Sequence, residues 1–207
     1  GSVNLAGATT IGVVTKVDAT ASTGNVTINL SGHAKSVAYF GSEGIDVYTA
    51  SKAGDNIYTG KSADQVTLTA GVRDTFVLKA ATDSQIGDTD KSGKITIAGD
   101  EVNAAAPAGF QQTIDTITTF VAGGLATTDR LDVTNYAFAG AQRGVVDVSA
   151  IVTNATNLTS IADLFAAPAG DRGLAVSLIG GHTYVFIDAN KDGNFTAADD
   201  SIIKLVG

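Results

Sequence analysis

Aspartate is the residue type in this sequence whose abundance and spacing point to chemistry. The chain has 21 acidic residues, and only Glu43 and Glu101 among them are glutamate. Solvated helical surfaces have no reason to prefer the shorter acid. Turns and calcium loops do prefer it, because a short carboxylate bends back to the local backbone and presents its oxygens at little entropic cost. The acid composition therefore predicts loops that bind Ca²⁺ through oxygen ligands.

A segment near the C-terminus, from Asp188 to Asp199, fits a twelve-residue calcium loop at every position. Oxygen-bearing side chains stand at positions 1, 3, 5, 9 and 12, and Gly193 at position 6 permits the sharp turn. The predicted ligands of this EF-hand-like loop are Asp188, Asn190, Asp192, Asn194 through its carbonyl, Thr196 and Asp199. The alternative is an Asx-Gly hairpin turn between predicted strands at Thr183 to Ile187 and Ser201 to Val206.

A second segment begins with the same pattern but does not complete it. Position 12 is Gly99, and the next acids, Asp100 and Glu101, come one and two residues late. If the loop bulges, one of them closes the shell; if not, the segment is a polar turn between strands. The predicted ligands are Asp88, Asp90, Ser92, Lys94 and Asp100.

A nine-residue period is the strongest organisational signal. Asp46, Asp55 and Asp64 recur at this interval, and each is followed two residues later by a residue suited to a strand interior. A fourth unit, with Asp74, follows after a one-residue slip. The first unit, Gly41 to Thr49, fits the pattern G-G-x-G-x-D-x-U-x, in which U is a large apolar residue, with serine at the second glycine position.

This period predicts turns that stack, since two nine-residue units complete one coil. Asp46 is then expected near Asp64 on one edge and Asp55 near Asp74 on the other, with Ca²⁺ between carboxylates that would otherwise repel. The alternative is a set of Gly-Asp turns between ordinary hairpins. The predicted ligands in these turns are Gly41, Glu43, Asp46, Asp55, Gly60, Asp64 and Asp74.

At these repeats the chain resembles the RTX family, whose proteins leave bacteria by type I secretion and whose nonapeptides form a calcium-filled parallel β-roll. Asp115 to Phe120, with Gly123, Asp129 and Leu131-Asp132, is similar to the segment that follows the roll in that family, although Thr119 stands where the family has aspartate. Val17 to Ala19 and Thr23 to Leu30 are similar to the lead-in of RTX-type surface-layer proteins and adhesins. The resemblance implies an uncleaved secretion signal within residues 151–207.

The predicted fold class is all-β. The chain has 24 glycines, two prolines and abundant threonine and valine, which favour short strands and tight turns. We expect a calcium-stabilised parallel β-roll or β-solenoid over residues 1–80 and a β-rich C-terminal region over residues 81–207. One or two short helices are predicted in that region, at Ser160 to Ala167 and at a turn over Ala98 to Ala106.

Composition argues against several classes of function. The chain lacks cysteine, so disulfides and thiolate metal sites are excluded. Its net charge is −8 and its 13 Lys and Arg residues are scattered, which argues against a nucleic-acid partner. No apolar run reaches the roughly 18 residues of a membrane span. Methionine is absent, so we expect this sequence to be a piece of a longer protein.

Catalytic motifs are also missing. The sequence contains neither H-E-x-x-H nor G-x-S-x-G, and its two histidines, His33 and His182, stand singly in strand-like surroundings. Gly60-Lys61-Ser62 resembles the end of a phosphate-binding loop, but Asp55 occupies the position of the required first glycine. We therefore predict that the chain is not an enzyme and has no catalytic residues.

Together these patterns predict an extracellular, calcium-binding structural protein of the bacterial cell surface. The resemblance implies export by the type I secretion machinery and, for the full-length protein, self-association into a surface lattice. The alternative is the calcium-binding secretion domain at the C-terminus of an RTX enzyme, toxin or adhesin. Ca²⁺ is the predicted cofactor in both cases.

Overall fold

The computed structural model describes residues 3–4, 14–86, 114–154, 160–168 and 170–206. The chain forms two compact units, and the first consists of Gly1–Leu78, Asp115–Val133 and Leu205–Gly207. The second consists of Lys79–Ile114 and Thr134–Lys204. The predicted boundary at residue 80 lies close to the point where the chain leaves the first unit, but residues 115–133 return to that unit. The candidate loop at Asp88 to Glu101 and the turn at Ala98 to Ala106 lie outside the described residues.

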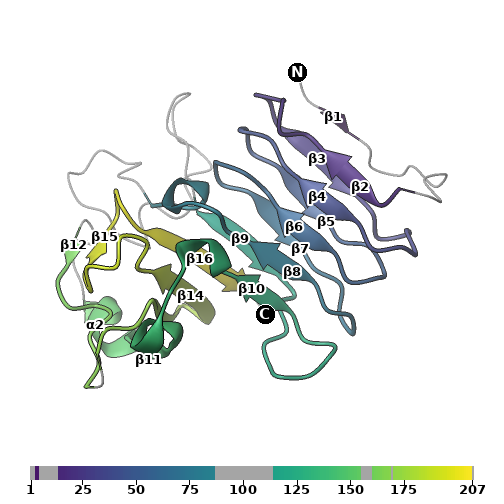
Figure 1. The fold of residues 1–207 in the computed structure, drawn as a ribbon. Coiled ribbons are helices and arrows are strands. Elements are labelled where there is room, and N and C mark those ends of the chain that lie inside the picture. Colours follow the sequence, from purple (N-terminus) through teal and green to yellow (C-terminus); the bar gives the residue numbers. More distant parts are fainter. Residues whose placement is uncertain (1–2, 5–13, 87–113, 155–159, 169, 207) are drawn as a thin grey trace. The chain divides into compact units, whose positions relative to one another are not determined.

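The first unit is built from short parallel strands that alternate between two sheets (Figure 1). Neighbouring strands of one sheet follow the order β1, β3, β5, β7, β9 within this unit, and those of the other follow the order β10, β8, β6, β4, β2. Every strand pair within these two series is parallel. The strands are β1 (Val3–Asn4), β2 (Lys16–Asp18), β3 (Val26–Asn29), β4 (Ala38–Phe40), β5 (Val47–Thr49), β6 (Asn56–Tyr58), β7 (Gln65–Thr67), β8 (Thr75–Val77), β9 (Asp115–Thr118) and β10 (Arg130–Asp132).

The nine-residue period explains this alternation. The central residue of each three-residue strand points into the unit, because side chains on a strand alternate between its faces. In β4 to β8 these residues are buried and stack in register, with Tyr48 paired to Val66 on one sheet and Tyr39 to Ile57 on the other. The central residues of β2 and β10 are partly exposed. The predictions of a β-rich fold and of parallel strands are therefore confirmed.

The second unit mixes parallel and antiparallel pairs. Its strands β13 and β14 form an antiparallel hairpin, and both turn residues, Gly180 and Gly181, have positive φ as a two-residue type I′ turn requires. Strand β11 pairs parallel with β13, and β12 pairs antiparallel with β15. The elements are η1 (Ala81–Asp83), η2 (Thr134–Tyr136), η3 (Gly140–Arg143), β11 (Val145–Asp147), α2 (Ser149–Asn154), β12 (Ser160–Ile161), β13 (Leu174–Ile179), β14 (His182–Ile187), β15 (Phe195–Thr196) and β16 (Ser201–Val206), whose last residues belong to the first unit.

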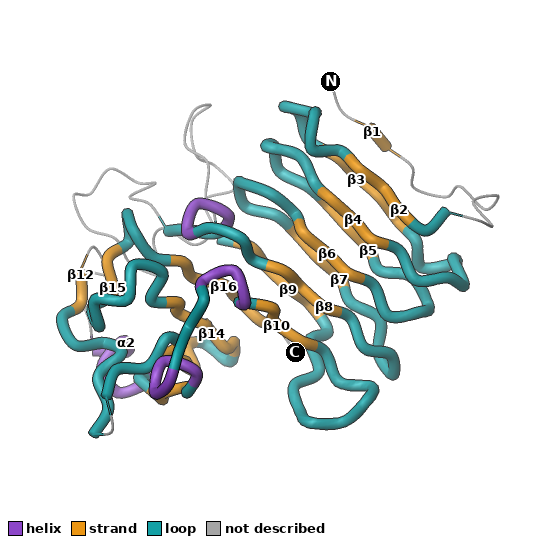
Figure 2. Tube along the Cα trace, viewed as in Figure 1, coloured by secondary structure: helices purple, strands orange, loops and turns teal. Residues whose placement is uncertain are grey.

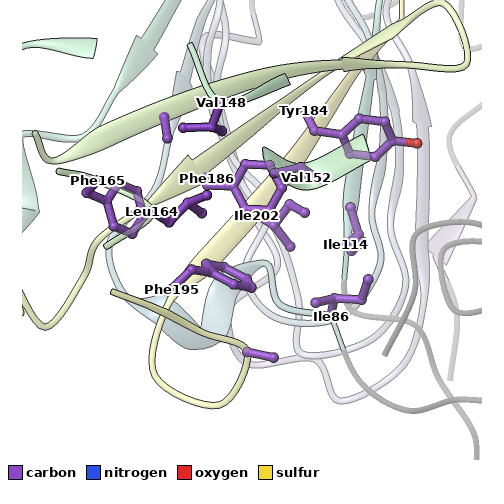
Figure 3. Close-up of a cluster of buried hydrophobic side chains, with 12 residues drawn as sticks. Ile86, Ile114, Val148, Val152, Leu164, Phe165, Tyr184, Phe186, Phe195 and Ile202 are labelled. Carbon is purple, nitrogen blue, oxygen red and sulfur yellow. The ribbon is translucent and has the colours of Figure 1, made fainter. Parts of the chain in front are cut away.

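One apolar cluster forms the core of the second unit (Figure 3). Phe186 on β14 and Phe195 on β15 meet edge to face, with ring centroids 5.0 Å apart. Val152 of α2 and Ile202 of β16 belong to the same cluster. Phe195 lies inside the predicted calcium loop, so this loop is anchored directly to the core.

The helix predicted at Ser160 to Ala167 is wrong. Ser160 and Ile161 form β12, and the chain then turns through Asp163, whose φ of 55° is incompatible with a helix (Figure 2). Leu164 and Phe165 are apolar because they fill the core, which imitates helical spacing in the sequence. The α-helix in the described part of the chain is α2, which precedes the predicted segment. None of the described helices has the length and hydropathy to cross a membrane.

Candidate functional site

A ladder of buried aspartates follows one edge of the first unit. The backbone N–H of Asp46 donates to Oδ1 of Asp64 at 2.7 Å, and the N–H of Asp64 donates to Oδ1 of Asp115 at 3.0 Å. At the other end, Oδ1 of Asp46 accepts from the N–H of Val26 at 3.0 Å. Each carboxylate therefore ties its own turn to the turn one coil earlier in the chain.

A second ladder follows the opposite edge in the same way. The N–H of Asp55 donates to Oδ1 of Asp74 at 2.7 Å, and the N–H of Asp74 donates to Oδ1 of Asp129 at 2.9 Å. The pairing of Asp46 with Asp64 and of Asp55 with Asp74 follows the nine-residue spacing. Sequence reasoning did not select Asp115 or Asp129 as site residues, because the intervening segment breaks the period.

Asp46 and Asp55 also hold their own turns through their second carboxylate oxygen. Oδ2 of Asp46 accepts the N–H of Ser42, and Oδ2 of Asp55 accepts the N–H of Ser51, both at 2.7 Å and both from four residues earlier. The same short connection recurs in the second unit, where the N–H of Thr196 donates to Oδ2 of Asp200 at 2.7 Å. A buried aspartate that accepts the N–H four residues earlier thus occurs in both units.

Asp46 and Asp55 each receive a tyrosine and a serine hydroxyl as well. Tyr39 donates to Oδ2 of Asp46 and Tyr48 to Oδ2 of Asp55, each at 2.8 Å. The hydroxyls of Ser42 and Ser51 donate to Oδ1 of the same two aspartates at 2.6 and 2.7 Å. The tyrosine rings stack with their centroids 4.4 Å apart. Burial raises the pKa of both tyrosines, with further contributions from the nearby aspartates, so their hydroxyls remain protonated donors.

Asp74, on the same ladder as Asp55, has a raised pKa. Burial is the main cause that raises its pKa to about 6, and the charges of Asp55 and Asp129 raise it further. The N–H groups of Asp55 and Thr69 oppose this shift because they stabilise the anion. This carboxylate therefore titrates close to neutral pH.

The predicted glycine ligands lie where turns of successive coils touch. A side chain at Gly41 would collide with the carbonyl of Thr59, and one at Gly60 would collide with the carbonyl of Ser42. Gly60 also has a φ of 97°, which L-residues rarely adopt. Glu43 is exposed and pairs with Lys61 at 3.0 Å across neighbouring turns. The glycines therefore permit close stacking.

The predicted calcium loop in the second unit is held by its own side chains. Asp188 is 1% exposed and accepts the N–H groups of Asp192 and Gly193, both at 3.1 Å. Asn190 Oδ1 also accepts the N–H of Asp192, and Asp192 Oδ1 accepts that of Asn194 at 2.8 Å. These bonds wrap the backbone around the first three candidate side chains. Gly193, with a φ of 81°, makes the sharp turn.

The loop is closed by Asp200. Asp199, which completes the sequence pattern, is exposed, whereas Asp200 is fully buried and accepts the N–H of Ala189 at 2.9 Å as well as that of Thr196. Burial raises the pKa of Asp200 to about 6, and the charge of Asp188 raises it further. The pKa of Asp188 is also raised, mainly by burial. Two acids that are electrostatically coupled thus lie within one loop.

Neighbouring segments support this loop from outside. The N–H of Phe165 donates to the carbonyl of Gly193 at 3.1 Å, and the N–H of Asp163 donates to the side chain of Asn194 at 3.0 Å. The Asp171 carboxylate lies against Gly193, close enough to collide with any side chain there. Asp171 is thus a further acid beside the loop that sequence spacing did not indicate.

No group of three or more His, Cys, Asp or Glu side chains converges as a metal site within the described ranges. Calcium loops do not require such a cluster, because they also use amide oxygens, backbone carbonyls and water beside few carboxylates. The donor set of the loop from Asp188 to Asp200 fits Ca²⁺ by this chemistry.

No protein-family model matches the sequence, and no curated protein matches it either.

Proposed function

We propose that this chain is a calcium-binding, non-enzymatic structural part of a secreted bacterial surface protein. The observation that carries calcium binding is the burial of Asp188 and Asp200 together in one loop, where each acid resists ionisation. A divalent cation would offset both the burial and the mutual repulsion of these carboxylates. Asp188, Asn190 and Asp192 would supply side-chain oxygens, and Asn194 its carbonyl.

The structural role is supported by the first unit. Its coils present short, regularly stacked parallel strands and tight turns, an arrangement suited to a rigid and extended scaffold. The resemblance of its repeats to the RTX family favours a place outside the cell and export by type I secretion. A surface lattice formed by the full-length protein remains part of this proposal.

Calcium titration of the chain, first stripped with a chelator, tests the metal site. We expect calorimetry to detect bound Ca²⁺ and the melting temperature to rise, since an ion held at a hundredfold excess over its Kd stabilises the folded state by about 2.7 kcal/mol. Asp188→Ala should lose one ion. Glu43→Ala, which removes an exposed acid of the first unit, is the matched control and should retain that ion. A melting curve unchanged between calcium and chelator would contradict the proposal.

The location is tested separately. Antibodies raised against the chain should label intact cells of the source bacterium, and calcium chelation should release or disorder the labelled material. Labelling that requires cell lysis would exclude a surface location. Electron microscopy of the full-length protein with and without calcium tests lattice formation.

A further inference from the structure

The strongest unexpected feature of the first unit is how completely its first two repeat aspartates are satisfied. Asp46 accepts four hydrogen bonds, from the N–H groups of Val26 and Ser42 and from the hydroxyls of Ser42 and Tyr39. All four lie between 2.6 and 3.0 Å. An ionised carboxylate has about four lone-pair positions, so these donors occupy its full acceptor capacity.

The next repeat reproduces the cluster nine residues later. Asp55 accepts from the N–H groups of Val37 and Ser51 and from the hydroxyls of Ser51 and Tyr48, all between 2.7 and 2.8 Å. The two clusters share the order Tyr-x-x-Ser-x-x-x-Asp, as in Tyr39, Ser42 and Asp46. Because the same four kinds of donor recur in both repeats, the arrangement is a regular feature of these two turns and not a chance contact.

The cluster changes at the third repeat. Ile57 stands at the position equivalent to Tyr39, and Gly60 stands at the position equivalent to Ser42. Both hydroxyls are therefore missing around Asp64, and a one-residue insertion precedes Asp74. The hydroxyl-lined clusters are thus a property of the coils that carry Asp46 and Asp55.

These contacts do not fit the metal that the repeat pattern implies. Calcium bound to Asp46 or Asp55 would have to displace buried N–H or hydroxyl donors, and each displaced donor would lose its partner inside the protein. We infer that hydroxyl groups take the place of calcium in these two turns, namely those of Tyr39, Ser42, Tyr48 and Ser51. The coils from Val26 to Asp55 are then held together without a metal ion. The hydrogen bonds stabilise each carboxylate in place of a cation.

Hydrogen exchange of the full chain, resolved by mass spectrometry, tests this inference. Peptides that contain Val26, Val37, Ser42 and Ser51 should be protected equally, within about twofold, in excess chelator and in millimolar calcium. Protection of these peptides that appears only with calcium would overturn the inference. Peptides across Asp188 to Asp200 report the proposed calcium loop in the same experiment, so failure of that proposal is seen independently.

Variants then test the hydroxyls. Tyr39→Phe combined with Tyr48→Phe keeps the stacked rings and removes two donors, and should lower protection of the same peptides in chelator by about tenfold. Tyr58→Phe removes a tyrosine hydroxyl from a partly exposed position of β6, outside the two clusters, and should change protection of these peptides by less than twofold. Unchanged protection in the double variant would overturn the role of the hydroxyls. Should that variant not fold, Ser42→Ala alone applies the same criterion with a smaller perturbation.

Discussion

The backbone amide of Asp46 is bound by the side chain of Asp64, which lies 18 positions later in the sequence and one coil further along the same edge. Ordinary parallel strands are joined only by backbone ladders, whereas here each turn is also joined to the next by a carboxylate. The bond is buried, so water cannot take the place of the carboxylate when the bond is lost. The ladders are therefore expected to contribute strongly to the stability of the first unit.

Asp64→Ala should destabilise the first unit by about 2 to 3 kcal/mol, because the buried N–H of Asp46 loses its acceptor. Urea denaturation in chelator measures this change without a contribution from calcium. Lys61→Ala is the control, since its pair with Glu43 is exposed and worth at most about 1 kcal/mol. Equal losses of unfolding free energy in the two variants would show that the ladder bond stabilises the unit no more than the exposed ion pair does.

Gly60→Ala should cost more than Gly71→Ala. Both glycines have positive φ, so each substitution carries the backbone penalty of about 1 kcal/mol. The added methyl group at Gly71 meets open space, whereas at Gly60 it collides with the carbonyl of Ser42 in the adjoining turn. The difference between the two losses of unfolding free energy measures the cost of the collision between adjoining turns. Equal losses would mean that the turns separate easily.

Asp200→Asn should weaken calcium binding more than Asp199→Asn does. The Asp200 carboxylate is buried within the loop, whereas Asp199 is exposed. Titration calorimetry at neutral pH compares the two affinities, with near-UV circular dichroism as a check that both variants fold. A greater loss with Asp199→Asn would restore the ligand assignment made from the sequence pattern.

Stability in chelator should rise as the pH is lowered from 7 to 5. The pKa of Asp74 is about 6 in the folded protein against an ordinary value of 3.8, so the folded state binds more protons between these values. The stabilising contribution of this group is complete below its unfolded pKa and is lost as the pH rises through 6. Asp200 has the same sign of shift and adds to the effect.

Melting temperatures at pH 5 and pH 7 measure this rise. Asp74→Asn removes one titrating group and should reduce the difference between the two temperatures. A melting temperature that falls between pH 7 and pH 5 in the parent protein would contradict the predicted sign.

The β-rich fold could be predicted because one signal repeats many times. A nine-residue interval in both the aspartates and the inward residues determines strand spacing, the parallel pairing and the two edges, even though Ala50 and Ala53 replace glycines of the pattern. No such repetition exists in the second unit. There, Leu164 and Phe165 gave a helical pattern in the sequence, and only their packing in the core explains them.

The candidate site could be located from the sequence but not assigned atom by atom. Two consecutive aspartates end the loop, and the pattern cannot tell which one turns inward, because that depends on how β16 begins at Ser201. Likewise, the spacing placed Asp46 and Asp55 at the turns but did not indicate that the hydroxyls of Tyr39 and Tyr48 would bind them. Their hydroxyls reach these carboxylates only because side chains from facing sheets meet inside the coil.

The first unit is discontinuous in sequence, and this affects the order in which it can form during synthesis. Strands β7 and β8 receive their partners β9 and β10 only after the ribosome has added residues 115–133. Until then both strands expose unpaired backbone groups, which invite association with other chains. Because Leu205–Gly207 also belongs to this unit, the first unit is completed only after the residues of the second unit have been synthesised.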